Sequence, residues 1–179
     1  PKYSCKPGRG SKYIGMPDDA LPLAGGAIVV TAPAQIAGGL QLTGPVPRRT
    51  DYEDTGGHFY LDAEGARPDE LPDDQAAYIE TPAGTVVILG CAHSGVVNIL
   101  NYVQELTGGK DIHTLIGGMH LGSASPERMA RTMEALKQFG LRRLMPCHCT
   151  GKKAIARMQD EFPDAWQACT ACEDVGTAR

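Results

Sequence analysis

The sequence predicts a mixed α/β fold with a largely parallel sheet in its second half. From residue 76 onward, short apolar runs alternate with amphipathic segments in the order strand, strand, helix, strand, helix, strand, helix. Successive strand–helix–strand units form right-handed crossovers, which place their strands parallel. The first half instead carries short apolar runs between turn residues, and this pattern favours antiparallel pairing.

Composition restricts the class of protein. The 179 residues are 42% hydrophobic and 21% charged, which suits one domain, and we treat residues 1–179 as a single domain. The formal net charge of −4 supplies no basic field for nucleic acid, so a nucleic-acid partner is not expected. No apolar run approaches the roughly 18 residues that cross a bilayer, so no membrane partner is expected. The cysteine spacing suits reduced thiols and predicts a cytoplasmic location.

The first half is predicted to be mostly loop. Residues 1–23 are rich in Pro, Gly and Lys and predict a loop. Short strands are predicted at Ala27–Thr31 and Gln35–Thr43. Residues 44–74 then form a long excursion whose apolar patch is His58–Leu61. A surface segment of about 30 residues is more often functional than idle.

The second half is regular. In order, we predict strands at Ala76–Ile79 and Thr85–Leu89, a helix at Ser94–Leu106, a strand at Ile112–Ile116, a helix from Pro126 to Gly140, a strand at Leu141–Met145 and a last helix that ends before Pro163. Ser125 and Thr150 are predicted to cap the second and third helices, because their hydroxyls can accept from the first-turn N–H groups.

Three of the five histidines stand directly after predicted parallel strands. They are His93, His120 and His148. Ligands bind beyond the carboxyl ends of strands in open α/β sheets, so these imidazoles are expected to converge. Clustered neutral imidazoles suit a transition metal, and Zn, Fe or Mn would each accept them. The alternative is that each is an ordinary hydrogen-bonded polar residue.

The cysteines leave several interpretations open. Cys147, Cys149, Cys169 and Cys172 resemble a four-thiolate zinc site, but the Cys-x-Cys spacing favours inert or redox-sensitive thiols. Cys91 could be a small buried residue, a group behind the metal ligands or a ligand itself.

Two arginines and the start of one helix are the candidates for substrate binding. Arg48 and Arg49 could bind a phosphate or carboxylate, and solvated surface arginines are the alternative. Thr150 and Gly151 open a helix beside His148, and helix N-terminal amides favour an anionic substrate. His58 could approach the site or lie on the loop surface.

Three motifs together resemble the downstream part of the metallo-β-lactamase-fold hydrolase superfamily, in the branch called dihydropterin-ribofuranosylaminobenzene-phosphate synthase-like. They are Gly90–Asn98, Gly117–Leu121 and His148–Gly151, with Gly44–Glu53 and Asp73–Ala76 also fitting. The resemblance implies an αββα sandwich with one or two divalent metal ions, zinc first and iron or manganese as alternatives. It also implies that a metal-held hydroxide attacks a small-molecule ester, amide or phosphoester.

The resemblance assigns metal-ligand positions to three histidines. His148 matches the last metal-binding histidine of the family, His93 lies where further downstream ligands occur, and His120 is the third. The signature His-x-His-x-Asp-His of the superfamily is absent, since no two histidines here stand two apart. We therefore expect the chain to be the downstream portion of a longer enzyme, with an incomplete fold and metal site.

Two further functions stay open. The branch name suggests a synthase that joins a dihydropterin to an aromatic amine phosphate. The missing signature instead favours an inactive binding module or fragment. We also expect exposed apolar faces, and hence poor solubility or association as a homo-oligomer.

Overall fold

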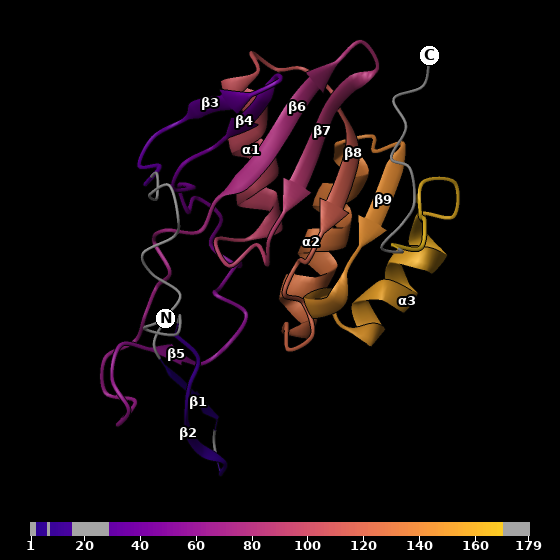
Figure 1. The fold of residues 1–179 in the computed structure, drawn as a ribbon. Helices are drawn as coiled ribbons and strands as arrows, with labels where there is room; N and C mark the ends of the chain where they lie inside the picture. Colours follow the sequence, from indigo (N-terminus) through magenta and orange to yellow (C-terminus); the bar gives the residue numbers. More distant parts are fainter. Residues whose placement is uncertain (1–2, 7, 16–28, 170–179) are drawn as a thin grey trace.

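The computed structural model describes residues 3–6, 8–15 and 29–169, arranged in two sheets and three helices (Figure 1). The larger sheet has six strands in the order β3-β4-β6-β7-β8-β9. These strands are β3 (Ala34–Ala37), β4 (Leu40–Leu42), β6 (Ala76–Thr81), β7 (Gly84–Leu89), β8 (Ile112–Gly117) and β9 (Arg143–Pro146). Pairing is antiparallel from β3 to β7 and parallel from β7 to β9, which confirms the mixed α/β prediction.

A helix follows each of the three parallel strands. They are α1 (Val96–Leu106), α2 (Pro126–Gln138) and α3 (Lys152–Glu161), and a single 3-10 turn, η2 (His148–Thr150), joins β9 to α3. Ser125 caps α2 as predicted, because its hydroxyl accepts from the N–H of Arg128. Among the described residues, no helix is long and apolar enough to span a membrane.

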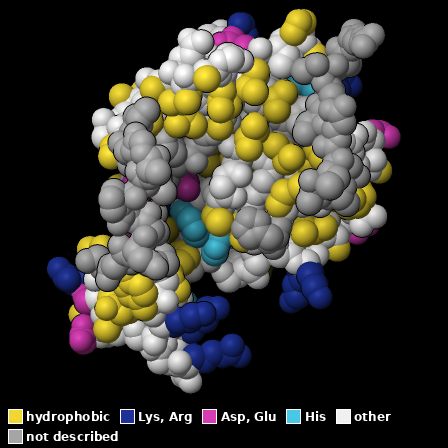
Figure 2. Space-filling model, in the orientation of Figure 1, with side chains coloured by type: hydrophobic (Ala, Val, Ile, Leu, Met, Phe, Trp, Pro, Cys, Tyr) yellow, Lys and Arg dark blue, Asp and Glu magenta, His cyan; other side chains and the backbone are white. Residues whose placement is uncertain are grey.

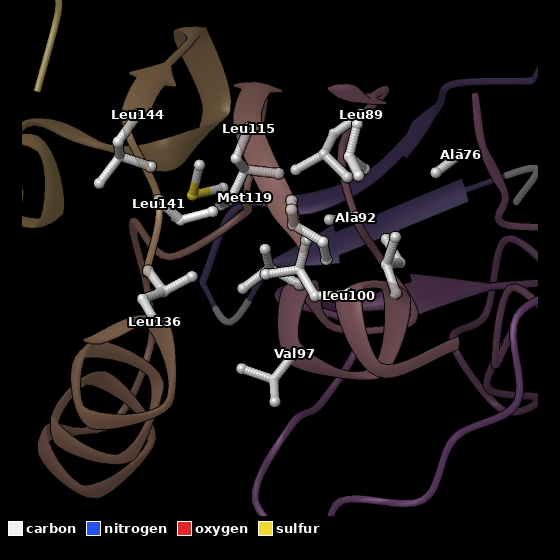
Figure 3. Close-up of a cluster of buried hydrophobic side chains, with 14 of the residues drawn as sticks. Ala76, Leu89, Ala92, Val97, Leu100, Leu115, Met119, Leu136, Leu141 and Leu144 are labelled. Carbon is white, nitrogen blue, oxygen red and sulfur yellow. The ribbon is translucent and has the colours of Figure 1, made fainter. Parts of the chain in front are cut away.

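The hydrophobic core lies between the six-stranded sheet and its helices (Figure 3). Leu89 of β7, Leu115 of β8 and Leu144 of β9 point toward helix residues that include Leu100 and Leu136. Four of these five side chains are completely buried, and Leu89 is 7% exposed. Burial of this apolar surface supplies the main stabilising term of the fold.

The opposite face of the same sheet is also apolar. Burial alternates along β7, where Val87 is buried and Ile88 is 39% exposed. Ile88 lies opposite Ala77 of β6 and Ile116 of β8, so these three residues share this face. Figure 2 shows hydrophobic side chains gathered on the side of the sheet that faces away from α1 and α2.

A smaller three-stranded sheet corrects the prediction that residues 1–23 are loop. Within that range, β1 (Tyr3–Lys6) and β2 (Gly10–Tyr13) form a hairpin, and β1 also pairs with β5 (Phe59–Tyr60). The partner of β1 lies more than fifty residues along the chain, so local composition could not reveal it. Residues 1–2, 7 and 16–28 lie outside the described part.

Other boundaries differ from the predictions. Gln35–Thr43 is not one strand, because a turn at Gly38 and Gly39 divides it into β3 and β4. The predicted strand Ala27–Thr31 begins outside the described residues, and residues 29–31 form no strand. Thr150 does not cap α3: the cap residue is Gly151, and the Thr150 hydroxyl instead accepts from the N–H of Met119.

Replacing adjacent residues of β7 tests the two faces of the sheet. We expect Leu89→Ala to lower the free energy of unfolding by about 3 kcal/mol, because it leaves a cavity against the helices. Ile88→Ala, its matched control on the other face, should cost less than about 1 kcal/mol. Urea denaturation measures both values, and equal losses would contradict a sheet whose described helices all lie on one face.

Candidate functional site

Two histidines lie together where β7 and β8 end. His93 follows β7 and His120 follows β8, and these strands are parallel neighbours. The two ring centroids are 4.3 Å apart with an interplanar angle of 46°. The Phe59 ring packs edge-on against both imidazoles, at 4.9 Å from His93 and 5.9 Å from His120. The structure therefore brings these two predicted residues into contact, and their role as metal ligands stays a prediction.

The backbone is strained at both histidines. His120 itself has φ 45° and Ala92, directly before His93, has φ 54°. Non-glycine residues rarely adopt this left-handed region, which costs about 1 kcal/mol or more and is common at functional sites. The loops after β7 and β8 thus hold Ala92 and His120 in a backbone conformation that non-glycine residues rarely adopt.

Backbone carbonyls determine the tautomer of both rings. The Nδ1 atom of His93 lies 2.7 Å from the carbonyl oxygen of Thr55, and that of His120 lies 2.9 Å from the carbonyl oxygen of Gly56. A carbonyl only accepts, so each Nδ1 carries the hydrogen, and in the neutral ring the lone pair is then on Nε2. Histidines that bind metal ions commonly have this arrangement.

Glu53 attaches the segment that bears these carbonyls to α1. Its two carboxylate oxygens accept from the N–H groups of Val97 and Asn98, at 3.0 and 2.9 Å. The cap residue of α1 is Gly95, which has no side chain to accept these bonds, so Glu53 supplies the missing cap. Burial raises the pKa of Glu53, and the helix N–H groups and Arg128 oppose that rise.

Asn98 fastens the same segment from inside α1. This buried amide accepts from the N–H groups of Arg49 and Thr50, both at 2.9 Å. It donates to the Thr50 hydroxyl at 3.0 Å and to the carbonyl of Ser94 at 2.9 Å. All four hydrogen-bonding positions of the amide are therefore used, which defines the path of the loop.

Asp54 and Arg128 hold the residues next to the carbonyls. The side chain of Arg128 is 1% exposed and pairs with Asp54, whose carboxylate also accepts from the N–H of Gly56 at 2.6 Å. Ser123 donates to the Gly56 carbonyl at 2.9 Å, beside the bond from His120. The peptide of Gly56 is thus held on both its N–H and its carbonyl side.

A pocket of about 790 Å³ opens beside His120. Gly56, His58, Phe59, Ser123 and Cys149 line it on the side of the histidines. Its volume is within the range typical of small-molecule sites. His58, predicted to approach the site, is therefore part of the pocket wall.

The turn η2 brings the backbone of His148 to the same edge of the sheet. The N–H of Cys147 donates to the carbonyl of Gly117 at 2.8 Å, and the Cys149 thiol lies 4.0 Å from the carbonyl of Cys91. Burial raises the pKa of the Cys91 and Cys147 thiols to about 11, so these thiols are protonated at neutral pH. The side chain of His148 lies outside the described part.

The predicted substrate-binding residues do not line this pocket, and their role in binding stays a prediction. Arg48 donates to the carbonyls of His93 and Glu70, both at 2.7 Å, and so supports the site from behind. Arg49 pairs with Glu105 at an exposed surface. Neither they nor Thr150 and Gly151 line the pocket beside His120.

The described side chains do not form a metal site by themselves. Among them, no group of three or more His, Cys, Asp or Glu is placed to hold a metal ion. The arrangement provides two imidazoles with the tautomer that coordination through Nε2 requires, and the third predicted ligand is His148.

Comparison with known proteins supports the fold prediction. No family model matches the chain. A crystal structure of Tm1679, a metal-dependent hydrolase of the β-lactamase superfamily, matches with a TM-score of 0.75 and 30% sequence identity, over 86% of this chain and 59% of that one. The chain has part of the metallo-β-lactamase fold. Among the described residues, one six-stranded sheet carries the helices, and the match covers 59% of the other chain, in agreement with the prediction of an incomplete sandwich.

Two curated proteins of Methanocaldococcus jannaschii are also similar. The 7,8-dihydropterin-6-methyl-4-(β-D-ribofuranosyl)-aminobenzene-5′-phosphate synthase is 32% identical over 99 residues, which are 55% of this chain and 34% of the synthase. An uncharacterized protein is 30% identical over 153 residues, which are 83% of this chain and 56% of the relative. The chain is thus related to a synthase and to a metal-dependent hydrolase. It spans between about a third and three fifths of the lengths of the three proteins it matches.

Substitution of Gly56 tests the close packing at the site. Gly56 has φ +75°, and an added Cβ would lie 2.5 Å from Nδ1 of His120. Gly140 is a matched control, because it has φ +62° and open space around its Cβ position. We expect Gly140→Ala to cost about 1 kcal/mol and Gly56→Ala about 2 kcal/mol more, measured by chemical denaturation. Equal losses would contradict the contact between Gly56 and His120.

Proposed function

We propose that this chain supplies part of the active site of a metal-dependent hydrolase in which His93 and His120 bind a divalent ion through Nε2. The observation that carries the proposal is the pair of Nδ1–carbonyl hydrogen bonds on two imidazoles whose centroids are 4.3 Å apart. His148, at the start of η2, is the proposed third ligand. The metal-dependent hydrolase with a TM-score of 0.75 supports this function.

The donor set favours zinc among the candidate metals. Imidazole nitrogens suit zinc, and iron and manganese are the alternatives. When bound, such an ion provides an activated water nucleophile and stabilises the oxyanion that develops at an ester or phosphoester. The protein residues position the imidazoles: Thr55 and Gly56 orient them, and Glu53, Asn98 and Arg128 hold the segment that contains both carbonyls.

A synthase reaction is the second candidate function. Its support is the 32% identity to the dihydropterin synthase over 99 residues. Product analysis separates the two functions: the full protein is incubated with phosphoester substrates, and separately with a dihydropterin and an aromatic amine phosphate. Release of alcohol and phosphate supports hydrolysis, whereas a new pterin–amine bond without hydrolysis would replace that proposal.

Metal binding tests the proposed ligands. We expect Zn²⁺, titrated against a chromophoric chelator, to bind the wild-type protein at least about tenfold more tightly than His93→Ala or His120→Ala. His113→Ala is the control, because His113 lies within β8 and its Nδ1 contacts the hydroxyl of Thr114. His148→Ala examines the third ligand, and unchanged metal content would remove His148 from the site. Equal affinity of wild type and His93→Ala would support the binding-module alternative.

A further inference from the structure

The pocket beside His120 has a basic side that the metal proposal does not use. Lys6 and Arg9 line it, together with Ser4 and Ile14. All four residues come from the N-terminal segment that contains the β1–β2 hairpin. In Figure 2, dark-blue side chains of Lys and Arg project from the lower part of the molecule, below the cyan histidines and in the region where Figure 1 places β1 and β2. The hairpin therefore forms one wall of the pocket, and the histidine site forms part of the other.

Strand pairing holds this basic wall beside the site. Strand β1 pairs with β5, where Ser4 lies opposite Phe59, and the N–H of Cys5 donates to the carbonyl of His58 at 3.1 Å. Ser4 and Lys6 stand two residues apart on β1, so both side chains point to the same face. A tight turn, in which the N–H of Arg9 donates to the carbonyl of Lys6 at 3.0 Å, brings Arg9 close to Lys6.

The charge of Lys6 and Arg9 is not balanced within the described part of the chain. Several other basic side chains pair with carboxylates: Arg49, Arg67, Lys110, Arg128, Arg131, Lys137 and Arg157. Lys6 and Arg9 form no such pair with a described residue, and no Asp or Glu is among the described residues that line the pocket. Two unbalanced cations on one wall, in a chain of net charge −4, attract an anion.

The rest of the pocket wall is partly apolar. Phe59 presents its ring beside the histidines, and Ile14 is 38% exposed. A planar or otherwise apolar ligand body can pack against these side chains, while its anionic end reaches the hairpin. The pocket thus offers apolar contacts to one end of a ligand and cations to its anionic end.

We propose that Lys6 and Arg9 bind the dianionic group of a small phosphate monoester whose apolar body packs against Phe59 and Ile14. Two adjacent cations match a dianion better than a carboxylate, and the Arg9 guanidinium can bind two phosphate oxygens at once. The inference rests on the proposed function in that the same molecule would present its reacting bond to the metal site at His120. The proposal names the substrate class, and it places anion binding at Lys6 and Arg9 instead of Arg48 and Arg49.

Binding of phenylphosphonate tests this inference without any metal or turnover. The probe cannot be hydrolysed at a P–O–C bond, and an excess of EDTA removes metal ions, so a failed metal site would leave the result unchanged. We expect Lys6→Gln/Arg9→Gln to raise the Kd by about tenfold or more, and each single variant by about threefold, in isothermal titration. Benzoate should bind more weakly than phenylphosphonate, and added salt should weaken both.

Lys12→Gln is the matched control, because it removes the same charge from the same hairpin at a residue that does not line the pocket. We expect it to change the Kd by less than about twofold. Neutral benzamide should bind the wild type and every variant equally, which shows that the pocket keeps its shape. The proposal is overturned if the double variant binds phenylphosphonate as the wild type does, or if Lys12→Gln weakens binding as strongly.

Discussion

Two peptide carbonyls, those of Thr55 and Gly56, determine the chemistry available at the end of β7 and β8. Each accepts a hydrogen bond from Nδ1 of one imidazole, so in the neutral form of both rings the lone pair is on Nε2. The carbonyls belong to consecutive residues, so the position of one short loop controls both rings at once. The other polar residues of the site hold this loop in position.

The loop is held by polar contacts, several of which are buried. Glu53 is buried against the N-terminus of α1, where helix N–H groups compensate the desolvation that raises its pKa. Arg128 is buried on α2, and its guanidinium pairs with Asp54. Its Nε and Nη2 atoms have no hydrogen-bond partner in the described structure. A buried, partly unsatisfied guanidinium is costly, so Arg128 holds the loop at a cost to the stability of the fold.

Sequence patterns predicted the regular part of this molecule and missed the contacts between distant segments. The strands that end in His93 and His120 and the helix capped by Ser125 depend on local signals, namely apolar periodicity and capping residues. The β1–β2 hairpin was missed because its stabilising partner is β5, far along the chain. Arg128 carried a signal that could have been used: it shares the helix face of Thr132 and Leu136, where a charged residue is unexpected. The tautomers of His93 and His120 could not be predicted, because they depend on the path of a loop without periodic structure.

The most direct test of this account is ¹⁵N NMR of the His93 and His120 imidazoles in the metal-free protein near neutral pH. We predict that the neutral form of each ring is the Nδ1–H tautomer, and that added Zn²⁺ shifts both Nε2 resonances while each Nδ1 keeps its hydrogen. Nε2–H tautomers in both rings, or resonances that Zn²⁺ does not move, would contradict it.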